Sequence, residues 1–326
     1  MVNFKNAAII DPIPVFLAPM AGVTDAVFRE LVSSFGASAV VSEMVSSESL
    51  VRRSKKTYTR LIGDNNLPKI VQIVGADPKH MAESAAINED LGIDAIDINM
   101  GCPAKKIVAN ASGAALLKNE DLAVRIAESV VNAVKIPVSL KMRLGWSARN
   151  INCLSLAKKF EDVGVQMLSI HCRTRDQMYS GVADWSAIAE LRDILRIPYL
   201  CNGDIRTSLD AIAAIRQSRS VGVMVGRAAL GRPWLLKQMI DFLHMGTLTA
   251  APALKEQLEI VMLHFRNTLD FYGKKRGIRM FRKHFCWYSH GLRGASAFRE
   301  KINVSDDVAF IEDYVHDFYH RQNGEV

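Results

Sequence analysis

The stretch IDAIDINMGCPAKK (residues 93–106) joins an apolar run to a Gly-Cys-Pro turn and two lysines. Its residues 95–99 have the apolar character of a strand that is buried on both faces. Cys102 follows between a glycine and a proline. From this position alone it could be a metal ligand, a reactive thiol, half of a disulfide or a small buried residue.

Similar apolar runs recur through the first two-thirds of the chain, with segments of helical periodicity between most of them. We predict eight strands, at residues 15–20, 39–43, 70–74, 95–99, 138–142, 167–171, 199–202 and 221–225. Apolar strands that alternate with helices indicate a parallel sheet covered on its faces, and eight such units in about 230 residues fit a (β/α)8 TIM barrel. A doubly wound open sheet is the alternative, but no G-x-G-x-x-G follows the first strand.

Two helix starts are expected from their capping residues: Thr24 before the first helix, and Ser305 before the last. After about residue 245 the strand signals stop, and apolar residues of a helical face follow from Leu254 to Tyr272. We therefore predict a catalytic barrel domain at residues 1–245 and an all-helical domain at residues 246–326.

Basic residues gather in two parts of the chain, although the net charge is only +7. Residues 271–301 contain nine basic residues, one acid and several interleaved aromatics, and RRSKKTYTR spans residues 52–60. Either stretch alone could be a solvated helix face. Two such stretches favour a polyanionic partner.

The five cysteines form no C-x-x-C pair and have no zinc-like spacing with histidines, so we expect no metal site. Their odd number argues against a disulfide framework. No apolar run approaches the roughly 20 residues that span a bilayer, and the N-terminus carries no signal-peptide pattern. We expect a cytoplasmic protein that does not enter membranes, and a monomer.

In (β/α)8 barrels the active site lies at the C-terminal ends of the strands. Gly203 and Gly226 follow the seventh and eighth predicted strands, where such barrels often bind phosphate, and Arg227 adds positive charge. Lys141 lies inside a buried strand, which is costly unless it meets an anion or an electron-rich ring. A phosphate and an interior cation suit flavin mononucleotide (FMN), and a sugar-phosphate substrate fits almost as well.

Nine motifs together resemble the tRNA-dihydrouridine synthases, and most of all their bacterial B-type subfamily. They are APMAGVTD (18–25), SEM (42–44), VQIVG (71–75), DINMGCPAKK (97–106), SLKMRLGW (139–146), IHCRTRDQMYSG (170–181), NGDI (202–205), VGRAALGRPW (225–234) and RKHFCWY (282–288). The resemblance implies an FMN enzyme that reduces uridines of tRNA to 5,6-dihydrouridine, with NADPH as the electron source.

The resemblance also implies roles for individual residues. Hydride would pass from reduced flavin to uracil C6, and Cys102 would donate a proton to C5, since thiols are mostly protonated near neutral pH. Asn99 and Arg143 would contact the uracil, while Lys105, Lys106, Arg282 and Lys283 would contact the tRNA. The residues expected to hold FMN are Pro19, Met20, Ala21, Gln72, Lys141, His171, Asn202, Gly203, Asp204, Gly226 and Arg227.

Three positions depart from the family pattern: Cys172 replaces a usual Gly, Leu144 a usual Thr, and residues 110–117 follow Val-Ala in place of a basic pair. These departures concern substrate positioning, because none removes a proposed catalytic group. Two other functions are considered: an FMN barrel dehydrogenase acting on a free pyrimidine, and a tRNA-binding or chaperone-like protein. The basic helical domain argues against the first of these.

Overall fold

The computed structural model describes residues 13–51 and 67–322, and the chain divides into two compact units. The first contains residues up to 228 and Leu236–Leu248, and the second contains Ala229–Leu235 and residues from 249 on. The basic stretch at residues 52–60 lies outside the described residues. The domain limits 1–245 and 246–326 stay predictions.

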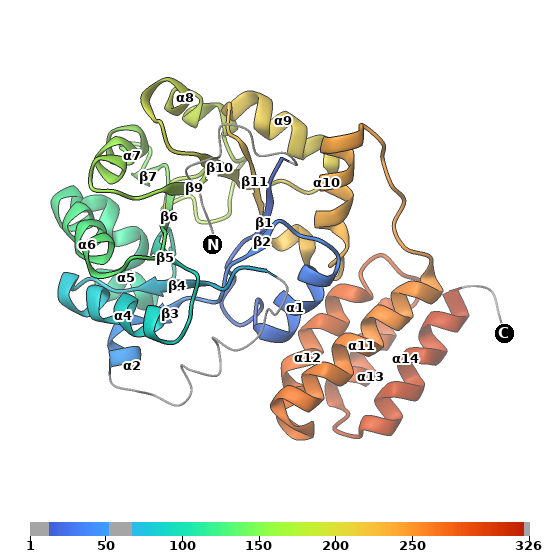
Figure 1. Cartoon of the computed structure of the whole chain (residues 1–326). Helices are drawn as coiled ribbons and strands as arrows, with labels where there is room; N and C mark the ends of the chain where they lie inside the picture. Colours follow the sequence, from blue (N-terminus) through green and yellow to red (C-terminus); the bar gives the residue numbers. More distant parts are fainter. Residues whose placement is uncertain (1–12, 52–66, 323–326) are drawn as a thin grey trace. The chain divides into compact units, whose positions relative to one another are not determined.

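The first unit is built on a sheet of parallel strands (Figure 1). The strands are β1 Val15–Leu17, β2 Ala39–Val40, β3 Val45–Ser46, β4 Ile70–Val74, β5 Ala95–Met100, β6 Val138–Arg143, β9 Met167–His171, β10 Tyr199–Asn202 and β11 Gly222–Val225. Their order is β2-β1-β11-β10-β9-β6-β5-β4-β3.

The second predicted strand, at residues 39–43, forms only β2 at its start, and β3 follows just beyond it; these two strands are the ends of the sheet. β2 pairs with β1, β3 pairs with β4, and Val41 between them forms a parallel bridge to Ile70. The two pieces thus share one strand position and close the ring, which leaves eight positions from the nine strands. The prediction of a (β/α)8 barrel is confirmed.

Helices follow the strands and cover the barrel (Figure 1). They are α1 Ala26–Ser34, α2 Ser47–Val51, α4 Pro78–Asp90, α5 Lys105–Ala109, α6 Glu120–Ala133, α7 Cys153–Asp162, α8 Leu191–Ile194, α9 Ser208–Ser218 and α10 Leu235–Met245. A short hairpin of β7 Gly145–Ser147 and β8 Asn150–Ile151 precedes α7, and the 3-10 helix η2 Gly113–Lys118 precedes α6.

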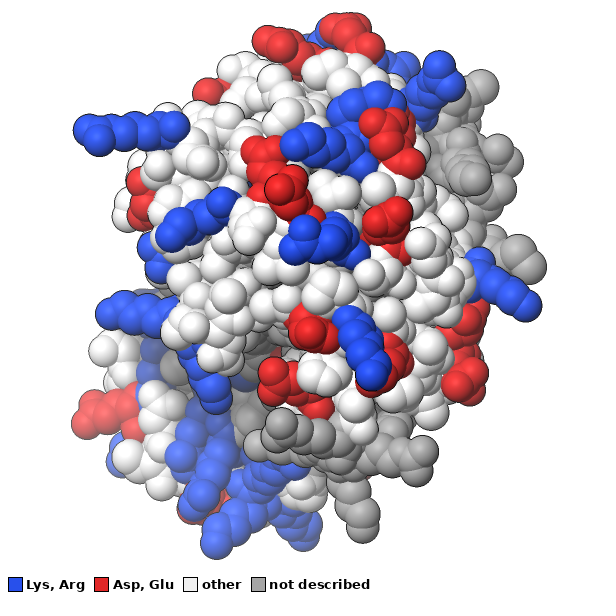
Figure 2. All heavy atoms as spheres, turned by 90° about the vertical axis from the view of Figure 1, so that its left-hand side faces the viewer, with Lys and Arg blue, Asp and Glu red and all other residues white. Residues whose placement is uncertain are grey.

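The face that carries α4, α6 and α7 mixes acidic and basic side chains (Figure 2). Lys158 pairs with Glu161 and Asp162, and Lys159 pairs with Glu120. The positive charges of these two lysines are therefore balanced by neighbouring acids.

Thr24 does not cap α1 as predicted. Asp25 is the N-cap, and its Oδ1 accepts from the N–H of Phe28 at 3.0 Å. The Thr24 hydroxyl instead accepts from the N–H of Met20 at 2.9 Å, which closes the turn after β1.

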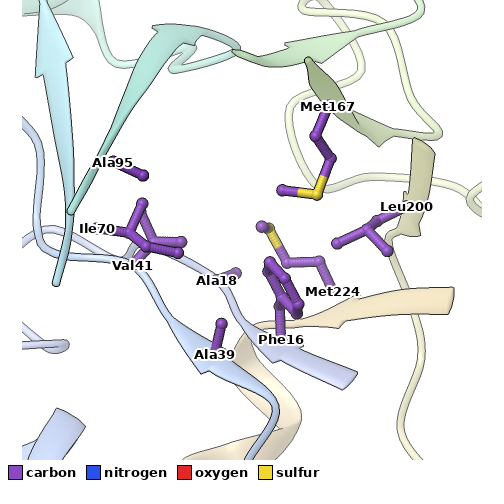
Figure 3. Packing of buried hydrophobic residues seen from close by; sticks show 9 residues of the cluster. All are labelled: Phe16, Ala18, Ala39, Val41, Ile70, Ala95, Met167, Leu200 and Met224. Carbon is purple, nitrogen blue, oxygen red and sulfur yellow. The ribbon is translucent and has the colours of Figure 1, made fainter. Parts of the chain in front are cut away.

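An apolar layer fills the barrel interior near the start of the strands (Figure 3). Its side chains point toward one another from different strands, and Ile70, Ala95 and Met167 are the first residues of theirs. The members of this layer are Phe16, Ala18, Ala39, Val41, Ile70, Ala95, Met167, Leu200 and Met224. This end of the barrel is therefore a packed core, as in other barrels of this type.

The second unit is helical throughout residues 254–322 except for short connections, as predicted. Its helices are α11 Leu254–Tyr272, α12 Lys274–Tyr288, α13 Ala295–Val304 and α14 Val308–Gln322. Phe265, Phe281 and Phe285 pack with ring centroids 4.6–5.1 Å apart, which holds α11 against α12. The predicted cap Ser305 is wrong for α14, because Asp307 accepts from the N–H of Ala309 at 3.0 Å.

Candidate active site

Polar side chains occupy the barrel interior beyond the apolar layer. Side chains alternate along a strand, so residues two and four positions past an inward-facing residue also face inward. Gln72, Asp97 and Ser139 are register partners on β4, β5 and β6. Nearer the C-terminal ends, Asn99 is opposite Lys141, Lys141 is opposite Ser169, and His171 is opposite Asn202. Most of the interior residues predicted at the strand ends thus lie on one surface.

Asn202 connects Lys141 to His171. Its Nδ2 donates to the carbonyl of Met224 at 2.6 Å, which leaves Oδ1 to accept from Lys141 Nζ at 3.1 Å and from His171 Nδ1 at 2.8 Å. His171 therefore carries its proton on Nδ1. Its Nε2 is buried and has no hydrogen-bond partner among the described residues.

The two basic groups of this cluster differ in charge at neutral pH. Desolvation and then the positive charge of Arg143 lower the pKa of Lys141 to about 8, although Asp97 acts in the opposite direction. Desolvation and then the charges of Lys141 and Arg143 hold the pKa of His171 well below 6.5. Lys141 is consequently a cation at pH 7, and His171 is neutral.

A chain of hydrogen bonds runs from the barrel interior to the Cys102 loop. Gln72 Nε2 donates to Asp97 Oδ2 at 2.7 Å, and Asn99 Nδ2 donates to Gln72 Oε1 at 2.7 Å. Asn99 Oδ1 then accepts from the backbone N–H of Gly101 at 3.2 Å and of Cys102 at 3.0 Å. Asn99 thereby holds the loop in which the half-buried Cys102 lies.

Arg143 connects the same loop to the one that follows β9. It is 3% exposed, and its Nε donates to the carbonyl of Gly101 at 2.9 Å. Its Nη1 donates to the carbonyls of Thr174 and Met178, both at 2.8 Å. Since Arg143 was predicted to contact substrate, the structure adds a second task for it, which is to join two loops.

Tyr179 lies at this end of the barrel between two arginines. The guanidinium of Arg227 stands 4.6 Å and that of Arg143 5.6 Å from its ring centroid, and its ring meets His171 edge-on at 6.4 Å. Its side chain is 52% exposed. An exposed ring held by cations can stack with a planar ligand.

The glycines predicted to bind phosphate differ in how strictly they are required. Gly203 has φ +123°, and a Cβ there would lie 2.9 Å from the Cβ of Ala183. A Cβ at Gly226 would meet nothing closer than 3.7 Å. Asp204 pairs through Oδ2 with the buried Arg173, and its Oδ1 lies 3.7 Å from Arg206 and 3.8 Å from Arg227, so Arg227 is held beside this carboxylate.

Other predicted residues lie near the site but are less enclosed. Ala21 is exposed, whereas Pro19 and Met20 are half-buried. Lys105 and Lys106 are exposed at the start of α5, and neither makes an ion pair with a described residue. Their exposure leaves both accessible for the contact with tRNA that the resemblance implies.

The predicted tRNA contacts in the second unit have a mixed outcome. Arg282 donates to the carbonyl of Ser305 at 3.0 Å and pairs with Asp306 at 2.8 Å, so it fastens α12 to the segment before α14. Lys283 is half-buried. Lys274, Lys275 and Arg279 are exposed on α12 and have no ion-pair partner among the described residues.

The sequence reasoning gave no role to three residues of the site: Asp97, Tyr179 and Arg173, of which Arg173 follows the sixth predicted strand. Asp97 could have been found by the signal that singled out Lys141, namely a charge within an apolar strand. Arg173 and Tyr179 belong to a loop without periodicity, so their contacts could not be read from spacing.

Neither a metal nor a membrane span is indicated in the part of the chain that the structure describes. Across residues 13–51 and 67–322, His, Cys, Asp and Glu side chains form no group of three able to hold an ion. No helix in these ranges is long and apolar enough to cross a bilayer.

Comparisons with known proteins agree with this geometry. The barrel is similar in fold to an amine oxidase of Pseudomonas geniculata that acts on 6-hydroxypseudooxynicotine (TM-score 0.52, 11% identity), over 76% of this chain and 50% of that one. A probable tRNA-dihydrouridine synthase of Rickettsia bellii is 44% identical over 94% of both chains.

Two further relatives cover similar lengths. One of Rhodobacter capsulatus, also named a probable tRNA-dihydrouridine synthase, is 46% identical over 92% of this chain and 93% of its own. The tRNA-dihydrouridine synthase B of Pseudomonas aeruginosa is 43% identical over 91% and 90%. Because the family model for dihydrouridine synthase matches residues 16–320, the chain belongs to the dihydrouridine synthase family of oxidoreductases.

Proposed function

We propose that this protein reduces uridine in tRNA to 5,6-dihydrouridine, with FMN as cofactor and NADPH as the source of electrons. The observation that carries the proposal is the meeting of Cys102 with Asn99, Lys141 and Arg143 at the C-terminal ends of β5 and β6. A proton donor, two cations and an amide within one site suit the reduction of a polarised carbon–carbon double bond.

The residues fit a flavin. Lys141 supplies a cation for an electron-rich ring, His171 Nε2 is a buried acceptor without a described partner, and Gly203 keeps the backbone clear for a phosphate. Gln72 and Asn202 would add contacts from the same interior surface. When bound there, FMN would supply hydride to C6 of the uracil.

The protein itself would orient the base and deliver the proton. Asn99 has its carbonyl engaged by the N–H groups of Gly101 and Cys102 and one N–H by Gln72, so it can offer a substrate its second N–H, which otherwise has only the Met44 sulfur at 4.0 Å. That donor suits a uracil carbonyl. The Cys102 thiol, fixed by the same loop, would protonate C5, and Tyr179 would stack against the base or its neighbour.

Basic side chains support a nucleic-acid substrate. Lys105 and Lys106 are exposed in the barrel unit, and Lys274, Lys275 and Arg279 are exposed on α12. Phosphate contacts by such residues would offset the few kcal/mol needed to take a uridine out of its stack.

The test compares Cys102→Ala with Cys286→Ala, which removes the other half-buried thiol of the described residues. We expect Cys102→Ala to retain flavin absorbance and tRNA binding but to lose dihydrouridine formation, while Cys286→Ala behaves as wild type. Dihydrouridine is measured by mass spectrometry of digested tRNA. Normal dihydrouridine formation by Cys102→Ala would refute its role, and equal turnover of free uridine would refute the tRNA substrate.

A further inference from the structure

Asp97 is a buried acid that the proposed chemistry does not use. It lies in the middle of β5 and is 1% exposed. Its two oxygens are both engaged: Oδ2 accepts from Gln72 at 2.7 Å, and Oδ1 accepts from the Ser139 hydroxyl at 2.7 Å. Burial raises the pKa of this carboxyl, although the bonds from Gln72 and Ser139 and the charge of Lys141 act against it. A buried acid is costly, so its retention within the interior needs a reason.

The hydrogen bonds above Asp97 have a fixed direction. Both Asp97 oxygens accept, Oδ2 from Gln72 and Oδ1 from Ser139, so Gln72 presents its N–H group to Asp97 and its carbonyl to Asn99. Asn99 must then donate to Gln72 and turn its own carbonyl toward the Cys102 loop. The backbone N–H groups at the far end can only donate, so both ends of the chain require the same arrangement.

We propose that Asp97 is a positioning residue: it is the acceptor that orients the amides of Gln72 and Asn99 and so holds Cys102 in place. Its effect on catalysis rests on the proposed function, whereas its effect on the loop does not. Without an acceptor at residue 97, the amide of Gln72 can turn over, and Asn99 can then lose its hold on the loop.

The loop can be followed without any assay of activity. Cys102 and Cys286 are half-buried, whereas Cys153, Cys172 and Cys201 are buried. Alkylation by iodoacetamide, resolved by peptide mass spectrometry, thus gives the rate at Cys102 relative to Cys286, which lies in the other unit. Cys286 serves as an internal reference within the same molecule.

Three variants of the full chain are compared. Asp97→Ala removes the acceptor, Ser139→Ala removes the other hydrogen bond to the same carboxylate, and Asp97→Asn keeps an oxygen that can accept from Gln72. We expect the Cys102-to-Cys286 rate ratio to rise about fivefold in Asp97→Ala, as the loss of one hydrogen bond implies. The ratio should stay near wild type in Ser139→Ala and return most of the way in Asp97→Asn. Dihydrouridine formation should fall most in Asp97→Ala, less in Asp97→Asn and least in Ser139→Ala.

Two outcomes overturn the proposal: an Asp97→Ala ratio no higher than that of Ser139→Ala, or an Asp97→Asn ratio as high as that of Asp97→Ala. If circular dichroism shows that Asp97→Ala does not fold, Gln72→Leu is used in its place. It removes the hydrogen bond between Gln72 and Asn99, and the Cys102-to-Cys286 rate ratio must then rise. An unchanged ratio there also overturns it. A wild-type protein that makes no dihydrouridine would refute the proposed function, yet the alkylation result would still decide the role of Asp97.

Discussion

The charge of Lys141 should set how flavin affinity depends on pH. Its Nζ lies 3.1 Å from Asn202 Oδ1, and its pKa is lowered to about 8. The cation is therefore present in the unliganded protein at pH 7 and is lost as pH rises through about 8. If flavin binds only when Lys141 is charged, protein in which Lys141 has lost its proton must take one up on binding, and this weakens flavin binding as pH rises.

The size of the effect follows from the fraction of protein that carries the charge. About nine-tenths of Lys141 is protonated at pH 7 and about one-tenth at pH 9, so the apparent affinity for FMN should fall about tenfold over this range, or ~1.4 kcal/mol. A phosphate ester has its second pKa near 6, so its charge changes little above pH 7.

The measurement is a titration of flavin-free protein into FMN, followed by the quenching of flavin fluorescence at several pH values. We expect Lys141→Gln to bind more weakly at pH 7 and to have a flat profile from pH 7 to 9. Lys158→Gln is the matched control, because Lys158 is an exposed lysine on α7 that pairs with Glu161 and Asp162. The reasoning fails if the wild-type profile is flat, or if Lys141→Gln keeps the slope.

Three other predictions follow from the structure. Burial lowers the pKa of His264 to about 3 and holds that of His284 well below 6.5. Below about pH 6.5 the unfolded chain therefore binds more protons than the folded one, and the helical unit should melt at lower temperature as pH falls from 7 to 5. A melting temperature that does not change with pH, measured by circular dichroism, would contradict this. Gln at the exposed Lys274 and Lys275 should reduce the log–log salt slope of tRNA binding by about 0.7–0.9 per lysine, and an unchanged slope would remove this surface from the interface. Gly203→Ala should cost about 1–3 kcal/mol of stability and deplete the purified protein of flavin, because φ is +123° and the new Cβ would lie 2.9 Å from that of Ala183. A variant that melts and absorbs as the wild type does would show that neither constraint matters.

The fold could be predicted because its signals are periodic. Strands β4, β9 and β10 begin and end where the sequence predicts, since apolar runs, their lengths and their spacing record burial on both faces. The second strand was expected to be continuous through residues 39–43. It breaks instead after Val40, where the backbone passes from β1 to β4: Val40 is paired with Leu17, whereas the N–H of Ser42 donates to the carbonyl of Ile70 at 3.0 Å.

The site could be predicted only as far as strand ends determine it. Register places Asn99 opposite Lys141 and His171 opposite Asn202 on neighbouring strands, so the strand positions bring these pairs to one end of the barrel. The sequence does not reveal which partner each polar side chain binds in the folded protein. Arg143 was predicted to contact the uracil, but three of its N–H groups donate to backbone carbonyls. Arg282 was predicted to contact tRNA, but it is paired with Asp306.

The same distinction explains why the departures from the family pattern are compatible with the site. The N–H of Cys172 donates to the carbonyl of Asn202 at 2.8 Å, and that of Leu144 donates to the carbonyl of Arg173 at 3.2 Å. Both hydrogen bonds come from the backbone, so they do not depend on which side chain stands at residues 172 and 144. The Cys172 sulfur lies 3.5 Å from that of Cys201, and this contact and burial raise the pKa of its thiol. A buried, protonated thiol is a poor nucleophile, so we expect Cys172 to fill space in the interior and to take no part in the reaction. Cys172→Gly should therefore lower the melting temperature while dihydrouridine formation per folded molecule stays unchanged; a loss of activity without a loss of stability would instead mean that Cys172 acts on the substrate.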